Sequence, residues 1–154
     1  MHRPAAAQHY PRFHLALPVT DLDDTLRFYT DVLGCATGRS AERWVDLDFF
    51  GHQLVLHRVA PQDHPTAATN PVDGHAVPAS HFGPVLDWDD FQTMADRLRT
   101  AGIDFVIEPY VRFAGRKGEQ ATLFIADPSG NHLEFKAFRD IGMLFAADLD
   151  APAS

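Results

Sequence analysis

The stretch FHLALPVTDLDDTLRFYTDVLG, residues 13–34, decides the fold, because the chain repeats its plan at HFGPVLDWDDFQTMADRLRTAG, residues 81–102. Each copy opens on a histidine and a short apolar run, passes through acidic residues into a helix-patterned segment, and closes on a glycine. The histidine and the glycine lie 20 positions apart in the first copy (14 to 34) and 21 in the second (81 to 102). This internal repeat predicts two copies of one structural unit.

Strand-like segments follow each predicted helix. In the first copy these are RWVDLDFF and HQLVLHRV, separated by a turn at Gly51. In the second copy they are DFVIEPYVRF, QATLFIAD and HLEFKAF, with turns at AGRKGE and DPSGN. Alternating and β-branched residues bounded by turn residues are typical of strands. The sequence therefore predicts an α+β fold, in which two tandem βαβββ modules form one curved, half-barrel-like mixed sheet around a metal site.

The segments outside the repeat divide the chain. We expect a flexible N-terminal tail at residues 1–10, a single domain at 11–138 and a C-terminal tail at 139–154. Within the domain, module one covers 11–60, a linker rich in Pro, Ala and Asn covers 61–79, and module two covers 80–138.

Composition narrows the function. The chain has 154 residues, 45% of them hydrophobic, and 13 basic against 21 acidic residues give a formal charge of -8. This charge repels nucleic acid and anionic membranes. With a single cysteine, no signal-peptide pattern and no apolar run long enough to span a bilayer, we expect a cytoplasmic protein that binds a small molecule.

Glu134 is the strongest sign of chemistry, because it is a carboxylate in the otherwise apolar strand HLEF and needs a proton, a cation or a metal as partner. His14 and His81 occupy matching places in the two copies. If the modules curl toward one another, these histidines and Glu134 converge from different strands. Two imidazoles and one carboxylate make a facial triad that leaves open metal positions for substrate. The sequence therefore predicts His14, His81 and Glu134 as metal ligands.

The first copy has no carboxylate to match Glu134. Aligning LVL of the first copy with LEF of the second places Val55 opposite Glu134, so we expect three protein ligands rather than four. Gln53 and His57 share the strand face of Val55. Gln53 is a candidate for substrate binding, and His57 is a candidate proton carrier because neutral imidazole works near pH 7.

These segments, together with DPSGNHLEFKAF, resemble the vicinal oxygen chelate superfamily over roughly residues 12–138. That superfamily includes glyoxalase I, type I extradiol dioxygenases, fosfomycin resistance enzymes and bleomycin-binding proteins. The resemblance implies a metal held by His14, His81 and Glu134. It is closest to the predicted extradiol dioxygenase branch over EPYVRF, GEQATLF and DPSGNHLEFKAF. Val55 departs from bacterial glyoxalase I, where a glutamate at that place supplies a fourth ligand.

The resemblance implies an extradiol-type dioxygenase that uses iron(II) and oxygen to cleave the ring of a catecholic substrate. Tyr110 and His57 are then candidates for orienting the substrate or moving a proton, and Arg112, on the strand face of Tyr110, is a candidate for binding a substrate carboxylate. A glyoxalase-like or fosfomycin-resistance-like lyase, isomerase or thiol transferase, using manganese, nickel or zinc, is the alternative. A metal-free binding protein is the third possibility, which the intact triad disfavours.

The superfamily resemblance also implies a homodimer, because its members commonly dimerise and some exchange modules between chains. Which chain would donate His14 is left open by the sequence.

Overall fold

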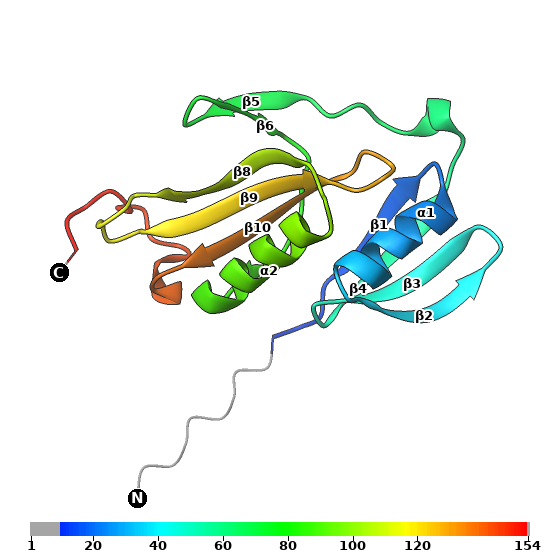
Figure 1. The fold of residues 1–154 in the computed structure, drawn as a ribbon, viewed down its shortest axis with the longest axis horizontal. Coiled ribbons are helices and arrows are strands. Elements are labelled where there is room, and N and C mark those ends of the chain that lie inside the picture. Colours follow the sequence, from blue (N-terminus) through cyan, green and yellow to red (C-terminus); the bar gives the residue numbers. More distant parts are fainter. Residues whose placement is uncertain (1–9, 154) are drawn as a thin grey trace, which may run out of the picture.

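The computed structural model describes residues 10–153, and its elements follow the repeat (Figure 1). The first module contains β1 (His14–Val19), α1 (Leu22–Arg27), the π-helical turn η1 (Phe28–Val32), β2 (Ala36–Ala41), β3 (Trp44–Phe49) and β4 (His52–Arg58). The second contains β7 (Val85–Leu86), α2 (Trp88–Thr100), β8 (Phe105–Arg112), β9 (Gln120–Ala126) and β10 (His132–Phe138). The predicted pair of βαβββ modules is confirmed. The N-terminal tail expected at 1–10 lies, except for residue 10, outside the described residues.

Each module carries a four-stranded sheet of its own, in the orders β1-β4-β3-β2 and β7-β10-β9-β8. In both sheets the first strand lies at the edge and pairs in parallel with the last strand, while the other neighbours are antiparallel. The fold is therefore mixed α+β, as expected. The strands are divided between two open sheets in place of one continuous half-barrel, and they do not close into a barrel.

The strand register makes the two modules equivalent residue by residue. In module one, Leu15 is the partner of Leu54, and Ala16 is the partner of Val55. In module two, Phe82 forms the corresponding parallel bridge to Leu133. Val55 is therefore the counterpart of Glu134, which is the alignment that the sequence predicted. Val55 is buried, with 5% of its surface exposed.

Acidic residues begin both helices. Asp21 precedes α1, and its side chain accepts a hydrogen bond from the Asp24 amide at 2.9 Å, which satisfies one free N–H of the first turn. Asp87 precedes α2 in an extended conformation and makes no side-chain cap. The apolar side of α2, with Phe91, Met94, Ala95 and Leu98, is buried in a core that both modules share. The repeat's helix-patterned segments thus bury the faces that the pattern predicted.

A buried polar cluster joins the turn between β9 and β10 to the first module. Asp127 accepts hydrogen bonds from the Tyr29 hydroxyl and from the side-chain nitrogen Nδ2 of Asn131, each at 3.0 Å. The Asn131 nitrogen also donates to the Pro18 carbonyl at 3.0 Å. Burial, and next the charge of Asp127, raise the pKa of Tyr29 well above its ordinary value, so the phenol stays a donor. The DPSGN turn therefore fixes the two modules against each other.

The linker contains structure that the sequence did not indicate. After a 3-10 turn, η2 (Pro61–Asp63), strands β5 (Thr69–Val72) and β6 (His75–Pro78) form a hairpin that pairs only with itself and extends above β8 and β9 (Figure 1). Asp73 and Gly74 make its turn, both at positive φ (49° and 78°), as Asp-Gly hairpin turns require.

The C-terminal segment packs on the second module. After the 3-10 turn η3 (Ile141–Met143), the Leu149 and Ala151 carbonyls accept hydrogen bonds from the Gly118 and Lys117 amides, at 2.7 and 2.9 Å. Along residues 10–153, no helix combines the length and the apolar character needed to cross a membrane.

Candidate functional site

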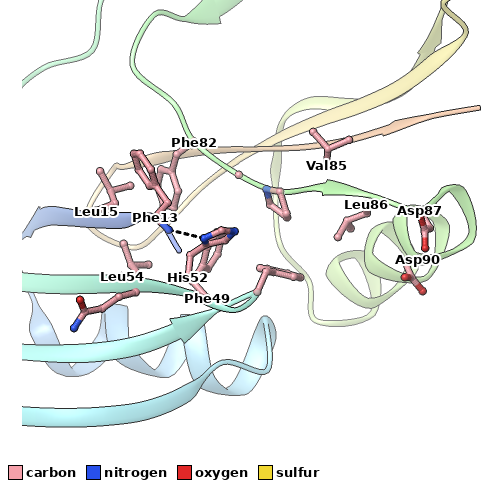
Figure 2. A pocket seen from close by; sticks show the side chains of 14 residues that line it. Phe13, Leu15, Phe49, His52, Leu54, Phe82, Val85, Leu86, Asp87 and Asp90 are labelled. Atoms are coloured by element: carbon pink, nitrogen blue, oxygen red, sulfur yellow. Dashed lines mark hydrogen bonds between the residues drawn. The ribbon is translucent and has the colours of Figure 1, made fainter. Parts of the chain in front are cut away.

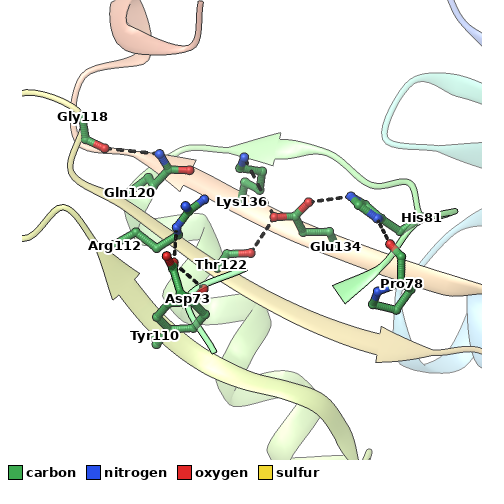
Figure 3. A network of polar contacts seen from close by, with 10 residues as sticks. All are labelled: Asp73, Pro78, His81, Tyr110, Arg112, Gly118, Gln120, Thr122, Glu134 and Lys136. Carbon is green, nitrogen blue, oxygen red and sulfur yellow. Dashed lines mark hydrogen bonds and ion pairs between the residues drawn. The ribbon is translucent and has the colours of Figure 1, made fainter. Parts of the chain in front are cut away.

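His81 and Glu134 form the centre of the candidate site (Figure 3). The Nε2 atom of His81 lies 3.0 Å from Oε2 of Glu134, and Nδ1 of His81 lies 2.6 Å from the Pro78 carbonyl oxygen. A carbonyl only accepts, so Nδ1 carries the hydrogen and a neutral His81 turns its Nε2 lone pair toward the carboxylate. Two lone pairs that face one another require a proton or a cation between them. This geometry fits a metal ligand pair.

The other oxygen of Glu134 contacts one residue of the neighbouring strand β9 and lies near one residue of its own strand β10. Oε1 accepts a hydrogen bond from the Thr122 hydroxyl at 2.7 Å, and the ammonium of Lys136 lies 3.9 Å away. The Glu134 side chain is only 14% exposed and that of His81 29%. A ligand carboxylate is commonly fixed by a hydrogen bond of this kind. Glu134 therefore has one oxygen oriented by the protein and one directed at His81.

His14 lies on the other sheet. Its Nδ1 lies 2.8 Å from Oε1 of Gln53, and Nε2 of Gln53 lies 3.3 Å from Asp46 Oδ2. Because a carboxylate only accepts, Asp46 fixes the orientation of the Gln53 amide, so the amide oxygen faces His14 and Nδ1 of His14 carries the hydrogen. His14 thus has the same tautomer as His81, with Nε2 left free for a metal.

The expected His14–His81–Glu134 cluster is not assembled within one chain. Among the residues that the structure describes, no group of three His, Cys, Asp or Glu side chains is placed to hold a metal ion. The physical reason is the division into two sheets. His14 turns toward β3 and β4 of its own module and lines a cavity of about 500 Å³ with Gln53 and Asp46, whereas His81 lines a different cavity of about 160 Å³.

Tyr110 and Arg112 lie on the face of the second sheet that carries Glu134. Tyr110 is opposite Thr122 in the ladder between β8 and β9, and Thr122 is opposite Lys136 in the next ladder. Burial, and next the hydrogen bond to Asp73, raise the pKa of Tyr110 to about 12. The phenol is therefore protonated near pH 7 and acts there as a hydrogen-bond donor.

His57 lies on the first sheet, opposite Trp44 on β3 and Pro18 on β1, and is exposed. In one chain the two expected catalytic residues, His57 and Tyr110, therefore belong to different modules. Gln53 contacts His14 and Asp46 and has the position of a support for the histidine.

Several residues of the site were not singled out from the sequence. Thr122 and Asp46 could have been found, because strand alternation in QATLFIAD and WVDLDF places them on the site face. Asp73 carries no such signal, since it reaches Tyr110 across 37 positions of the chain. Only the path of the linker brings it there.

A cavity of about 670 Å³ lies between the modules (Figure 2). Phe13, Phe49 and Phe82 line it, with Asp87 and Asp90 on the α2 side. His52 is also present, and its Nδ1 accepts a hydrogen bond from the Phe13 amide at 2.8 Å. None of the three expected metal ligands lines this cavity, so it is separate from the site around Glu134.

Comparison with known proteins agrees with the fold. The family model of the Glyoxalase/Bleomycin resistance protein/Dioxygenase superfamily matches residues 13–135. The virulence protein STM3117 of Salmonella typhimurium is 30% identical over 125 residues, which cover 81% of this chain and 82% of that protein. The superfamily as a whole is matched, and the extradiol dioxygenase branch expected from the sequence is not singled out by this match.

Solved structures give the same result. The crystal structure of a glyoxalase/bleomycin resistance protein/dioxygenase from Alicyclobacillus acidocaldarius is similar with a TM-score of 0.70 and 33% identity, covering 88% of this chain and 96% of that chain. Lactoylglutathione lyase from Agrobacterium tumefaciens has the same fold, with a TM-score of 0.60, 24% identity and coverage of 94% and 99%. The chain therefore belongs to the glyoxalase, bleomycin resistance protein and dioxygenase superfamily.

Proposed function

We propose that this protein is a divalent-metal enzyme acting on a small molecule that binds the metal through two oxygens, with His81 and Glu134 as two of the metal ligands. One observation carries the proposal. The Nε2 atom of His81 faces a carboxylate oxygen at 3.0 Å while its Nδ1 is committed to the Pro78 carbonyl. A cation between these two atoms removes the repulsion of their lone pairs.

The third ligand in this proposal is His14 of a second copy of the chain. Each module carries an incomplete set, His14 on the first and His81 with Glu134 on the second, and both histidines have Nδ1 committed to an oxygen. A two-fold dimer that faces module one of one chain with module two of the other completes two equal sites. Val55, the counterpart of Glu134, supplies no fourth ligand.

The residues around Glu134 favour a reaction that does not consume dioxygen. A divalent cation, when bound, polarises the chelating oxygens of a substrate. The ammonium of Lys136 lies 3.9 Å from Glu134 Oε1, and Thr122 keeps Glu134 in place. The protonated Tyr110 is a further hydrogen-bond donor, which Asp73 engages in this structure. Such groups stabilise oxyanions. We infer a lyase, isomerase or thiol transferase, a class that includes the lactoylglutathione lyase of the same fold. The ring-cleaving iron(II) dioxygenase becomes the second reading.

The first test is a calorimetric titration of metal-free protein with manganese, nickel, zinc and, under nitrogen, iron(II). We expect one ion per chain, and a loss of affinity of at least about 100-fold in Glu134→Gln, with Glu42→Gln in an exposed turn as the matched control. A protein that binds no metal would overturn the proposal and favour a metal-free binding protein.

Activity then separates the reaction classes. The loaded protein is offered the hemithioacetal of methylglyoxal and glutathione, fosfomycin with a thiol, and a panel of catechols in an oxygen electrode. Turnover under nitrogen supports the lyase, isomerase or transferase reading. Oxygen uptake that depends on iron(II) and catechol supports the dioxygenase in its place.

A further inference from the structure

The hairpin of β5 and β6 inserts an acidic side chain into the donor groups beside the candidate metal site (Figure 3). Asp73, at its turn, accepts a hydrogen bond from the Tyr110 hydroxyl at 3.0 Å and forms an ion pair with Nε of Arg112. Both donors come from β8. Tyr110 lies directly opposite Thr122 on β9, the residue whose hydroxyl donates a hydrogen bond to Glu134. An anion is therefore already bound at this place, and the chain itself supplies it.

Asp73 engages the Tyr110 and Arg112 donors through one of its two carboxylate oxygens. The Tyr110 hydroxyl and the Arg112 Nε both contact the same oxygen, Oδ2. Arg112 Nε is buried, and its contact with Asp73 lacks the alignment of a hydrogen bond. A guanidinium binds a carboxylate or phosphonate best through two parallel N–H bonds, which engage two oxygens. A free oxyanion has this choice of orientation, and a side chain fixed in a turn does not.

Gln120 adds a second unfilled group. It lies opposite Arg112 in the ladder between β8 and β9 and is 1% exposed. Its Nε2 donates weakly to the Gly118 carbonyl at 3.4 Å, while its Oε1 has no hydrogen-bond partner among the described residues. Buried amides are normally satisfied, and because Oε1 only accepts, a water or a ligand hydroxyl can complete its bonding; it does not itself bind an anion.

The hairpin forms no ladder with either four-stranded sheet along residues 10–153, although one of its sides is partly buried, with Val72, His75 and Val77 half-buried and Pro78 buried. Its contacts with β8 include those of Asp73 and the ring of His75, 4.9 Å from that of Tyr110. The Asp73 side chain is 41% exposed. Because the Asp73 side chain is partly exposed, water and salt screen its pairing with Arg112, and an anion from solution can compete for the same donors.

We propose that Arg112 and Tyr110 form an anion subsite for a carboxylate or phosphonate of the substrate, and that Asp73 is its internal competitor. This inference rests on the proposed function, because it assigns the anion to the same substrate whose oxygens bind the metal. A neutral molecule cannot replace Asp73 on Arg112 without leaving that cation unpaired. An anionic one restores the pairing. Asp73 thereby selects for anionic substrates.

The test measures anion binding to metal-free protein, so it does not depend on the metal or on turnover. Acetate and methylphosphonate are the probes, acetamide is the neutral control, and the Nε–H signal of Arg112 in an NMR titration reports binding. We expect Asp73→Asn to bind both anions about 10-fold more tightly than the wild type, because the competitor is removed. Asp63→Asn, also in the linker, is the matched control and leaves the affinity unchanged.

Further variants and a hydrogen-exchange measurement distinguish an Asp73 that competes with anions from an Asp73 that only holds the hairpin in place. Arg112→Gln loses anion binding in the wild-type and Asp73→Asn backgrounds alike, and Asp73→Ser repeats the gain. In the wild type, saturating methylphosphonate increases hydrogen exchange of the amides of β5 and β6, because Asp73 leaves its donors. Unchanged or weaker anion binding in both Asp73 variants would overturn the subsite and leave the metal proposal intact. If the Asp73 variants bind anions more tightly but the protein binds no metal, the metal proposal is overturned and the anion subsite stands.

Discussion

Glu134 is a poorly exposed carboxylate with a donor on one oxygen and an imidazole nitrogen on the other. Such a group is stable only when its partners compensate the lost hydration. Thr122 supplies part of that compensation from β9, by donating a hydrogen bond to the proposed metal ligand Glu134.

We predict that Thr122→Val weakens zinc binding by about 10-fold or more, because Glu134 loses the hydrogen bond that orients it. A calorimetric titration measures the change. Thr93→Val is the control, since the Thr93 hydroxyl donates to the Asp89 carbonyl on the exposed side of α2. Equal affinities in the two variants would show that Glu134 does not depend on this hydroxyl.

Cys35 is the single cysteine and behaves as a packing residue. Burial, and next the charge of Asp48, raise its pKa from 9.0 to about 11. A pKa raised in the folded state keeps the thiol protonated between these two values. Only the thiolate reacts, so alkylation of the native protein is slow at neutral pH.

We therefore predict that iodoacetamide labels native Cys35 about 100-fold more slowly at pH 8 than it labels the chain in urea. The native rate continues to rise with pH toward 11, whereas the rate in urea levels off near 9. Mass spectrometry of timed samples measures both. A native rate equal to that in urea would show that the thiol is open and ionised.

At the scale of elements, the approach of residues 81–84, which precede β7, to β10 brings His81 and Glu134 together. Glu134 donates its amide to the Phe82 carbonyl at 2.8 Å, which places His81 beside the Glu134 side chain. The backbones are so close here that a Cβ on Gly83 would lie 1.7 Å from the Glu134 carbonyl oxygen. Glycine is therefore required at position 83 because a side chain would collide with the β10 backbone; its φ angle is not in the left-handed region.

We predict that Gly83→Ala lowers the free energy of unfolding by at least about 1–3 kcal/mol, because the strands must separate. Metal affinity falls with it, since His81 moves from Glu134. Urea unfolding and zinc titration measure the two effects. Gly38→Ala on β2 is the control for the unfolding measurement alone, since the nearest atom to the added Cβ is the Asp46 Cβ at 3.2 Å. A Gly83 variant no less stable than that control would contradict the close approach.

At the scale of the whole molecule, the proposed metal ligands are divided between the two modules. The contacts between them run through the shared core and the Asp127 cluster, and none of these joins His14 to Glu134. A second chain can bring the halves together without changing either module.

We predict that inactive His14→Ala chains and inactive Glu134→Ala chains restore metal sites when mixed and allowed to exchange. Random pairing makes about half of the dimers mixed, and each mixed dimer holds one intact site of two, so about a quarter of the wild-type sites return. Metal content of the purified mixture measures this. Mixing His81→Ala with Glu134→Ala restores none, because both changes fall in the same half. No recovery in the first mixture, with a monomer mass, would contradict the shared site.

The two modules could be predicted from the sequence, because helix and strand periodicity and the repeated histidine-to-glycine spacing are local properties of the chain. The sequence also predicted the equivalence of Val55 and Glu134, since strand alternation fixes which residues share a face. It identified Glu134 as the carboxylate that needs a partner, and His81 is at 3.0 Å from it.

The way in which the modules meet could not be predicted from the sequence. The division into two sheets, the separation of His14 from His81, and the arrival of Asp73 at Arg112 depend on contacts between residues far apart in the chain. No local pattern encodes such contacts, because they result from packing of the core and from the path of the linker. Candidate ligand residues could thus be proposed from the sequence, whereas their arrangement in space could not be predicted from it.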